Sequence, residues 1–237
     1  MKIGVIVAIK KEAFLIYKKI KNKKKIKICG FKIYFGKVYN FVIYIIISGI
    51  GKVSATISSM ILINNFDIKI MINIGSAGSL SNKYKIGTIL IPNKIGYHDV
   101  DVTAFKYKLG QIPKIPAFMK INKIIFNKFK NKIISEKKII TGLLLTGDQF
   151  INKKRSINIL KKFPKAIAVD MESCAISHVC YKFKIPIIVI KSISDFSNEK
   201  SHYDFKNFLS LSVYNSSKIL FCVLENFNII KNNLSNF

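Results

Sequence analysis

The 237 residues are 50% hydrophobic and 12% aromatic, which excludes the composition of a disordered chain and supplies a core for one large domain, expected over residues 1–237. The 40 Lys and Arg residues against 12 Asp and Glu give a formal charge of +28, which would ordinarily suggest nucleic acid or an anionic membrane as a partner. The excess is almost entirely lysine, with Arg155 as the single arginine, so the chain offers almost none of the bidentate guanine contacts of specific DNA readers, and the codon bias of an AT-rich genome explains the charge better.

In chain order, apolar runs rich in Ile and Val alternate with longer amphipathic segments, the pattern of a mixed or parallel sheet covered by helices. The predicted strands cover residues 2–8, 32–36, 41–48, 69–74, 88–92, 139–146, 166–170 and 186–192. The predicted helices cover residues 11–21, 52–65, 116–132, 153–163, 172–183 and 204–226. The fold class is therefore α/β.

Membrane insertion and export are not expected. The apolar run after Lys2 could imitate a signal peptide, but Lys10, Lys11 and Glu12 follow it directly, with no cleavage site. No apolar run approaches the roughly 20 residues that span a bilayer. We therefore expect a soluble protein that does not associate with a membrane.

The cysteines give no sign of a metal site or of a disulfide framework. They are Cys29, Cys174, Cys180 and Cys222. They include no CxxC pair and no spacing with histidine that is typical of zinc. We therefore expect free thiols, a cytoplasmic location and no metal.

Small or acidic residues stand at or shortly after the ends of several predicted strands. They are Glu12, Gly49 and Gly51, the segment 75–78, Gly147 and Asp148, Asp170 and Glu172, and Asp195. In open α/β sheets, ligands bind beyond the carboxyl ends of the strands, so we expect these residues to meet at one crevice.

Two glycine-containing segments favour turns when each is taken alone. Residues 48–54, Ser-Gly-Ile-Gly-Lys-Val-Ser, follow a strand, but Val53 replaces the Ser or Thr of a P-loop, and Ser54 replaces the third glycine of a dinucleotide site. Residues 75–78, Gly-Ser-Ala-Gly, predict a turn whose Ser76 hydroxyl and backbone amides face a ligand.

The polar clusters have simple structural interpretations. Residues 97–101, Tyr-His-Asp-Val-Asp, match no familiar metal-ligand spacing and favour a hydrogen-bonded polar loop. Residues 169–173, Val-Asp-Met-Glu-Ser, place two acids at a strand-to-helix junction, where capping is the simplest role. Asp195, with Ser194 beside it, follows a strongly apolar strand, and partial burial there would raise its pKa enough for it to act as an acid.

Taken together and in order, seven segments resemble those of the 5'-methylthioadenosine/S-adenosylhomocysteine nucleosidases. They are Ala8 to Glu12, then 48–53, 73–78 (Asn-Ile-Gly-Ser-Ala-Gly), 98–105 (His-Asp-Val-Asp-Val-Thr-Ala-Phe), 147–151 (Gly-Asp-Gln-Phe-Ile), 171–172 (Met-Glu) and 194–195 (Ser-Asp). The resemblance runs from Met1 to about Glu225. It implies a three-layer nucleoside phosphorylase-like fold with a central mixed β-sheet surrounded by helices, usually a homodimer, with no cofactor and no metal.

The resemblance implies hydrolysis of the bond between adenine and ribose in methylthioadenosine, S-adenosylhomocysteine and also 5'-deoxyadenosine, a step in methionine salvage. Asp195, supported by Ser194, would protonate N7 of the purine, and Glu12 would activate the attacking water. Glu172 would hold the ribose hydroxyls and favour the positive charge that develops on the sugar.

The resemblance also implies a set of binding residues. Phe150 would stack on adenine and the backbone of Ile151 would read its polar edge, with Met171 beneath the ribose. Ser76 and Gly78 would lie near the nucleoside, and Ile50 and Phe205 would line the 5' pocket, completed by Phe105 and Tyr107 of a neighbouring subunit. Two departures from the family stand out: Lys10 and Lys11 replace acids, and Lys191, also expected at the binding site, replaces an arginine and loses its planar fork.

Two alternatives remain at this point. A phosphorylase of the same fold would replace water with phosphate, although Glu12 would repel a dianion and suits water. A basic protein that binds nucleic acid would retain the fold as a scaffold, but only the charge of +28 supports it.

Overall fold

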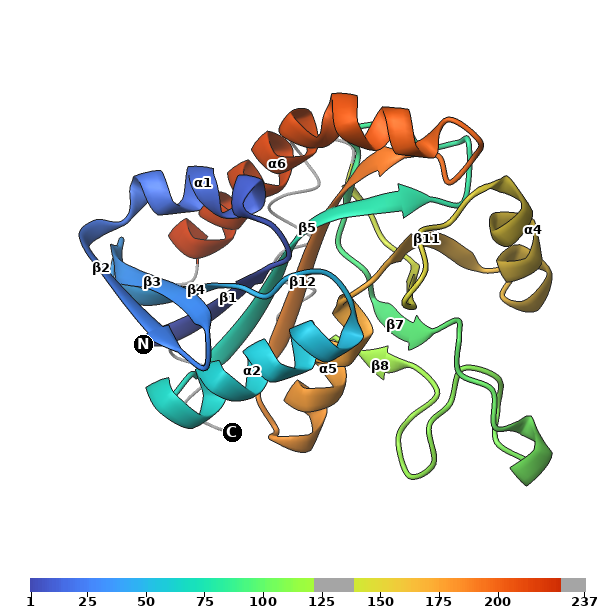
Figure 1. The fold of residues 1–237 in the computed structure, drawn as a ribbon, viewed down its shortest axis with the longest axis horizontal. Helices are drawn as coiled ribbons and strands as arrows, with labels where there is room; N and C mark the ends of the chain where they lie inside the picture. Colours follow the sequence, from blue (N-terminus) through green and yellow to red (C-terminus); the bar gives the residue numbers. More distant parts are fainter. Residues whose placement is uncertain (122–138, 227–237) are drawn as a thin grey trace.

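The computed structural model describes residues 1–121 and 139–226, whose strands form one mixed sheet of twelve strands with helices against both faces (Figure 1). The strands are β1 (Lys2–Val7), β2 (Lys21–Ile28), β3 (Phe31–Val38), β4 (Phe41–Ile47), β5 (Ile70–Ser79), β6 (Ile89–Leu90), β7 (Lys94–Tyr97), β8 (Met119–Lys120), β9 (Ile139–Ile140), β10 (Leu143–Thr146), β11 (Ala166–Asp170) and β12 (Ile187–Asp195). The helices are α1 (Lys10–Lys19), α2 (Lys52–Phe66), the 3₁₀ turn η1 (Thr103–Phe105), α4 (Lys153–Lys162), α5 (Ser173–Lys182) and α6 (Ser201–Asn226).

The centre of the sheet is parallel and buried. β1 pairs in parallel with β4 and β5, and β12 pairs in parallel with β5. Helices α1 and α6 cover one face, and α2 and α5 cover the other (Figure 1). Because both faces are covered, these strands carry continuous Ile and Val runs instead of alternating ones. The predicted α/β class with a mixed sheet and surrounding helices is confirmed.

The topology brings the ends of five strands to one place. The parallel pairing sets the carboxyl ends of β1, β4, β5 and β12 at the same edge of the sheet. β11 pairs antiparallel with the end of β5, through Ala168 with Ser79 and Val169 with Gly78. β11 therefore runs back along the end of β5, and this direction brings the residues that follow β11 beside Ser76.

Two predicted strand ends were wrong in an informative way. β5 continues through Ser79, so residues 75–78 belong to a strand and do not form the predicted turn. β12 continues to Asp195, because Lys191, Ser192 and Ile193 pair with Gly75, Ser76 and Ala77. The glycines of this segment, Gly75 and Gly78, leave room for side chains from neighbouring elements to lie close to the strand.

Other differences arise at the sheet margins. The predicted helix over 116–132 is wrong at its start, where β8 pairs antiparallel with β7 and buries Met119, and residues 122–132 lie outside the described part of the chain. β2 and β7 were not predicted, and residues 139–146 divide into β9 and β10. β2 was missed because its lysines hide the strand pattern, which an exposed edge strand tolerates.

Within residues 1–121 and 139–226, none of the helices combines the length and apolar character that crossing a bilayer requires.

Candidate active site

A pocket of about 150 Å³ lies where the strand ends meet. Eleven of the side chains or backbones expected at a binding site line it: Glu12, Ile50, Ser76, Gly78, Phe150, Ile151, Met171, Glu172, Ser194, Asp195 and Phe205. Ala77 and Asp170, expected at the crevice as strand-end residues, line it too, together with residues that sequence reasoning did not single out: Ala8, Ile9, Gln149, Val169 and Ser197. Residues far apart in the chain thus share one cavity at the edge of the sheet.

Glu12 is fixed from both sides of its carboxylate. It lies in the first turn of α1, and its Oε2 accepts hydrogen bonds from the amides of Ala8 at 2.9 Å and Ile9 at 3.2 Å. Its Oε1 accepts from the Ser76 amide at 3.2 Å and the Ser76 hydroxyl at 3.3 Å. Burial raises the pKa of Glu12, although Lys191 and the backbone amides oppose the shift. Glu12 is therefore an oriented carboxylate with increased basicity.

The carboxylate of Glu12 can lie against β5 only because residue 75 is a glycine. A Cβ atom on Gly75 would lie 2.7 Å from Oε1 of Glu12, closer than van der Waals contact permits. A larger residue at position 75 would therefore displace the Glu12 carboxylate from the sheet.

The two acids after β11 have different roles. Asp170 caps α5, because both its carboxylate oxygens accept from the Ser173 amide, at 3.3 and 3.1 Å. Glu172 makes no capping bond; its Oε1 instead accepts from the Gly51 amide at 3.0 Å. The expectation of capping is thus correct for Asp170 and wrong for Glu172. Gly51 belongs to the predicted turn segment 48–54, whose last three residues begin α2. The turn therefore contributes to the site as well as connecting β4 to α2.

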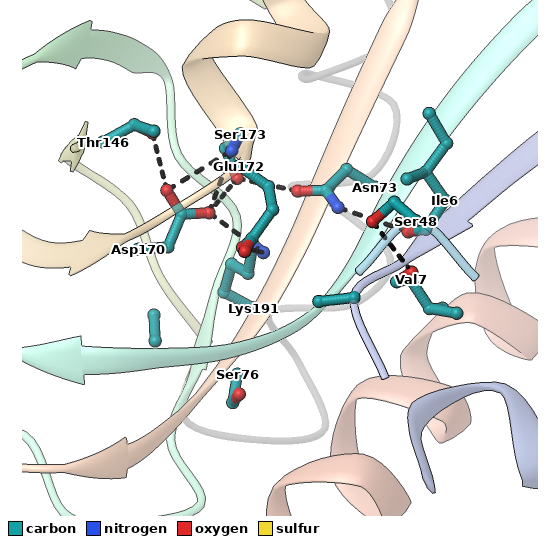
Figure 2. Close-up of polar contacts among 12 residues, drawn as sticks. Ile6, Val7, Ser48, Asn73, Ser76, Thr146, Asp170, Glu172, Ser173 and Lys191 are labelled. Atoms are coloured by element: carbon teal, nitrogen blue, oxygen red, sulfur yellow. Dashed lines mark hydrogen bonds and ion pairs between the residues drawn. The ribbon is translucent and has the colours of Figure 1, made fainter. Parts of the chain in front are cut away.

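Lys191 lies behind the pocket instead of lining it. Its side chain is 2% exposed, and its Nζ lies 2.9 Å from Oδ2 of Asp170 and 4.0 Å from Oε2 of Glu172 (Figure 2). Burial lowers the pKa of Lys191, but the carboxylates of Asp170, Glu172 and Glu12 outweigh burial, and the pKa is raised overall. The lysine that replaces the expected arginine is thus a fully charged partner of buried acids. We find no direct contact between it and the cavity.

The same cation acts on Glu172. Burial raises the pKa of Glu172 to about 7, with Lys191 lowering it and the nearby charges of Asp170 and Glu12 raising it. Glu172 therefore changes its charge close to neutral pH.

Hydroxyl and amide groups hold this cluster to the sheet (Figure 2). Thr146 Oγ1 donates to Asp170 at 2.6 Å, and Ser173 Oγ donates to Asn73 Oδ1 at 2.7 Å. Asn73 in turn donates from Nδ2 to the carbonyl of Ile6 at 3.2 Å. The chain of contacts connects α5, β10, β5 and β1, so the acids are held by several elements of the core.

Asp195, the last residue of β12, also lines the pocket. Its Oδ2 accepts from the Ser194 hydroxyl at 2.9 Å, and its Oδ1 accepts from the Ser197 amide at 2.9 Å. Burial raises the pKa of Asp195, against these two hydrogen bonds, as the apolar strand before it led us to expect. A Cβ on Gly78 would lie 2.9 Å from Oδ1, so glycine is again required for the approach.

Aromatic side chains form the outer wall. The rings of Phe150 and Phe205 meet edge to face, with centroids 6.1 Å apart. Phe150 and Ile50 are partly exposed at the rim, whereas Ile151 is buried. Apolar side chains and several carboxylates in one cavity suit a flat, partly apolar ligand that carries polar groups.

Phe105 and Tyr107 are not among the residues that line the pocket of this chain. Phe105 ends η1, in the green segment that extends from the sheet at the lower right of Figure 1, and it is largely exposed. The loop before it is polar and hydrogen-bonded: Asp101 accepts from the amide of Thr103 at 3.0 Å and from its hydroxyl at 2.7 Å. In the described ranges, no group of three or more His, Cys, Asp or Glu residues is suited to a metal ion.

Comparisons with known proteins identify relatives over almost the whole chain. The family model described as "Phosphorylase superfamily" matches residues 2–225. The 5'-methylthioadenosine/S-adenosylhomocysteine nucleosidase of Buchnera aphidicola subsp. Acyrthosiphon pisum (strain Tuc7) is 49% identical over 95% of this chain and 98% of its own. The enzyme of that name from Haemophilus ducreyi is 37% identical, over 96% and 99%. A solved structure of the Neisseria meningitidis enzyme in complex with methylthio-immucillin-A superposes with a TM-score of 0.91 at 32% identity, over 94% of this chain and 98% of that one.

The raised pKa of Glu172 predicts a specific pH dependence of stability. The pKa of about 7 in the folded protein exceeds the ordinary glutamate value of 4.5, so ionising this group destabilises the fold progressively as pH rises through that interval. Glu172→Gln removes the ionisable group while keeping the shape. We expect the variant to match the unchanged protein in thermal unfolding at pH 5 and to melt at a higher temperature at pH 8.

Glu199→Gln is the control, because its side chain is 79% exposed. An equal change at both pH values in Glu172→Gln would contradict the assignment of the raised pKa to this residue.

Proposed function

This chain belongs to the phosphorylase superfamily and, within it, to the 5'-methylthioadenosine/S-adenosylhomocysteine nucleosidases, and from this membership we propose how its pocket performs the reaction. The enzyme hydrolyses the N-glycosidic bond of both nucleosides, giving adenine and the 5-thio-substituted ribose, an activity that fits methionine salvage. We propose 5'-deoxyadenosine as a further substrate, a single domain over residues 1–237, and a cytoplasmic location.

The observation that carries the mechanism is that two buried acids with raised pKa values, Asp195 and Glu12, lie in one pocket. Breaking the bond needs a proton on the leaving base and a water molecule deprotonated at the anomeric carbon. Asp195 would donate its proton to N7 of adenine, which leaves as the neutral base. Glu12 would accept a proton from water as the oxygen bonds to the anomeric carbon, so the sugar gains hydroxide and the charges balance.

Glu172 would bind the ribose, the part of the substrate that lies between the adenine protonated by Asp195 and the water activated by Glu12. Its carboxylate would accept hydrogen bonds from the ribose hydroxyls, and its negative charge would stabilise the oxocarbenium-like transition state. The Gly51 amide and Lys191 favour the ionised form that this role requires. Ser194, at 2.9 Å from Asp195, would hold the acid toward the base.

The apolar wall would bind the rest of the nucleoside. Phe150 would stack on adenine and the backbone of Ile151 would contact its polar edge, with Met171 under the ribose. Ile50 and Phe205 would contact the 5' substituent. All five residues line the same cavity, which supports these roles.

Hydrolysis fits the electrostatics of this pocket better than phosphorolysis does. Among the described residues that line it, none is a lysine or arginine. Lys191 pairs with Asp170 and Glu172, and the guanidinium of Arg155 donates to the carbonyl of Phe150 outside the pocket. A phosphate dianion would therefore meet carboxylates without a cation to offset them.

We propose that the enzyme is a homodimer whose interface includes the outer face of α2. Ile50, Val53 and Ile57 are 58%, 71% and 43% exposed, and the spacing of four between Val53 and Ile57 puts them on one helix face. Phe105 is 76% exposed in this chain. Large apolar side chains gathered on one face are typical of a protein interface, and a partner's Phe105 and Tyr107 would then close the pocket rim near Ile50.

The reaction is tested by incubating the purified protein with 5'-methylthioadenosine and following adenine by chromatography, with and without phosphate. We expect adenine and free methylthioribose at equal rates in both conditions. Formation of a sugar 1-phosphate that depends on phosphate would instead identify a phosphorylase.

The roles of the two acids are tested by Asp195→Asn and Glu12→Gln. Each should lower kcat by at least the roughly 100-fold typical of acid or base catalysis, because it removes one proton transfer. Glu199→Gln serves as an exposed-carboxylate control. Near-normal turnover in a folded Asp195 or Glu12 variant would refute the role given to that residue.

The dimer is tested by Val53→Glu in analytical ultracentrifugation. An unpaired charge buried at the interface costs several kcal/mol, so the dissociation constant of the dimer should rise roughly 100-fold. Ile157→Glu, at a similarly exposed apolar side chain on α4, should leave association unchanged. A fully active monomer in the unchanged protein would disprove the proposed interface.

A further inference from the structure

Lys52, the first residue of α2, joins three elements outside the pocket. Its Nζ lies 2.7 Å from Oδ2 of Asp99 and 3.6 Å from Oδ2 of Asp148. Its backbone amide donates to Oδ1 of Asp148 at 2.8 Å, and the Asp148 amide donates to Oδ2 of Asp99 at 3.0 Å. The three residues form a closed network that fixes the start of α2 to the segments that follow β7 and β10.

This network is continuous with the pocket on two sides. Gly51, directly before Lys52, donates its amide to Glu172 at 3.0 Å. Asp148 is followed directly by Gln149, Phe150 and Ile151, which line the cavity. Gly51 has a φ of +98°, and a Cβ there would lie 3.1 Å from Oδ1 of Asp148, so the turn and the carboxylate are closely packed. A displacement of the network would therefore move the amide that binds Glu172.

We propose that Lys52 is a positioning residue of the reaction, which acts through Asp99 and Asp148 to hold the Gly51 amide on Glu172 and the segment 149–151 against the base. This inference rests on the proposed role of Glu172. The partly exposed ion pairs would add little to stability by themselves, so their main effect is on geometry.

The consequence is a predicted change in pH dependence. The groups that act on Glu172 are Lys191 and the Gly51 amide, which favour its carboxylate, and Asp170 and Glu12, which disfavour it. Loss of the amide contact would raise the pKa of Glu172 further. Since the ionised form binds ribose, the acid limb of kcat/KM should move to higher pH.

The test compares pH profiles of adenine release from 5'-methylthioadenosine for Lys52→Met, Lys52→Arg and the unchanged enzyme. We expect kcat/KM of Lys52→Met to fall roughly 10-fold at pH 6, which corresponds to a shift of about one pKa unit, and to stay within about twofold at pH 8.5. Lys52→Arg should restore most of the loss, because it retains the charge and the donors. Lys69→Met is the matched control: Lys69 pairs with Asp67 at 2.6 Å, beyond the other end of α2.

Asp148→Ala separates positioning from a simple charge effect. Removing a negative charge would by itself lower the pKa of Glu172 and move the acid limb to lower pH. Loss of positioning predicts the opposite, a move to higher pH. The inference is supported if Asp148→Ala and Lys52→Met both move the limb upward while Lys69→Met does not.

The inference is overturned if Asp148→Ala moves the limb downward, if neither variant moves it, or if Lys52→Met reduces activity equally at every pH, as general structural damage would. Thermal unfolding of each variant establishes that it is folded, and Lys52→Arg with Asp148→Ala preserves the test if Lys52→Met does not fold. Failure of the proposed function is distinguishable, because the unchanged enzyme would then release no adenine.

Discussion

The ammonium group of Lys191 is a buried positive charge that acts on three of the pocket's acids, Asp170, Glu172 and Glu12. Glu12, Asp170, Glu172 and Asp195 are all buried, and a carboxylate without a partner in such surroundings would be protonated. Lys191 contacts Asp170 at 2.9 Å and lies 4.0 Å from Glu172, and it also acts on Glu12 over a longer distance. Lys191 is not among the groups that shift the pKa of Asp195, which are burial, Ser197, Ser194 and Asp204. The same protein interior thus provides carboxyl groups with different affinities for a proton, which hydrolysis of a glycosidic bond needs.

The arrangement depends equally on the sheet. Parallel pairing of β1, β5 and β12 delivers Glu12, Ser76 and Asp195 to one edge, and the antiparallel return of β11 adds Glu172. Side chains larger than those at Gly75 and Gly78 would occupy the space of Glu12 and Asp195. The close-packed sheet therefore fixes where the two acids lie, and the loops contribute mainly the apolar wall.

Much of this could be predicted from the sequence because the central strands have strong apolar runs and end in acids. The position of Lys191 could not, since its contact with Asp170 joins strands whose neighbours are set only by the tertiary fold. Segment 75–78 looked like a turn because glycine is common in turns, yet the pairing of β12 extends the strand through it. Capping at 170–172 was predicted without distinguishing the two acids, because only the folded backbone directs Asp170 to Ser173 and Glu172 to Gly51.

Edge strand β2 gives the lysine excess a physical consequence of its own. β2 pairs with β3 alone among the described strands, so within this part of the chain its other side is an open sheet edge that a second molecule could extend. Five of its eight residues, in the sequence Lys-Asn-Lys-Lys-Lys-Ile-Lys-Ile, are lysines, and all five are exposed. Two such edges repel one another over about 10 Å at 0.1 M ionic strength, which discourages fibre-like association in a chain this rich in isoleucine. A composition rich in both isoleucine and lysine therefore supplies both a hazard of aggregation and a defence against it.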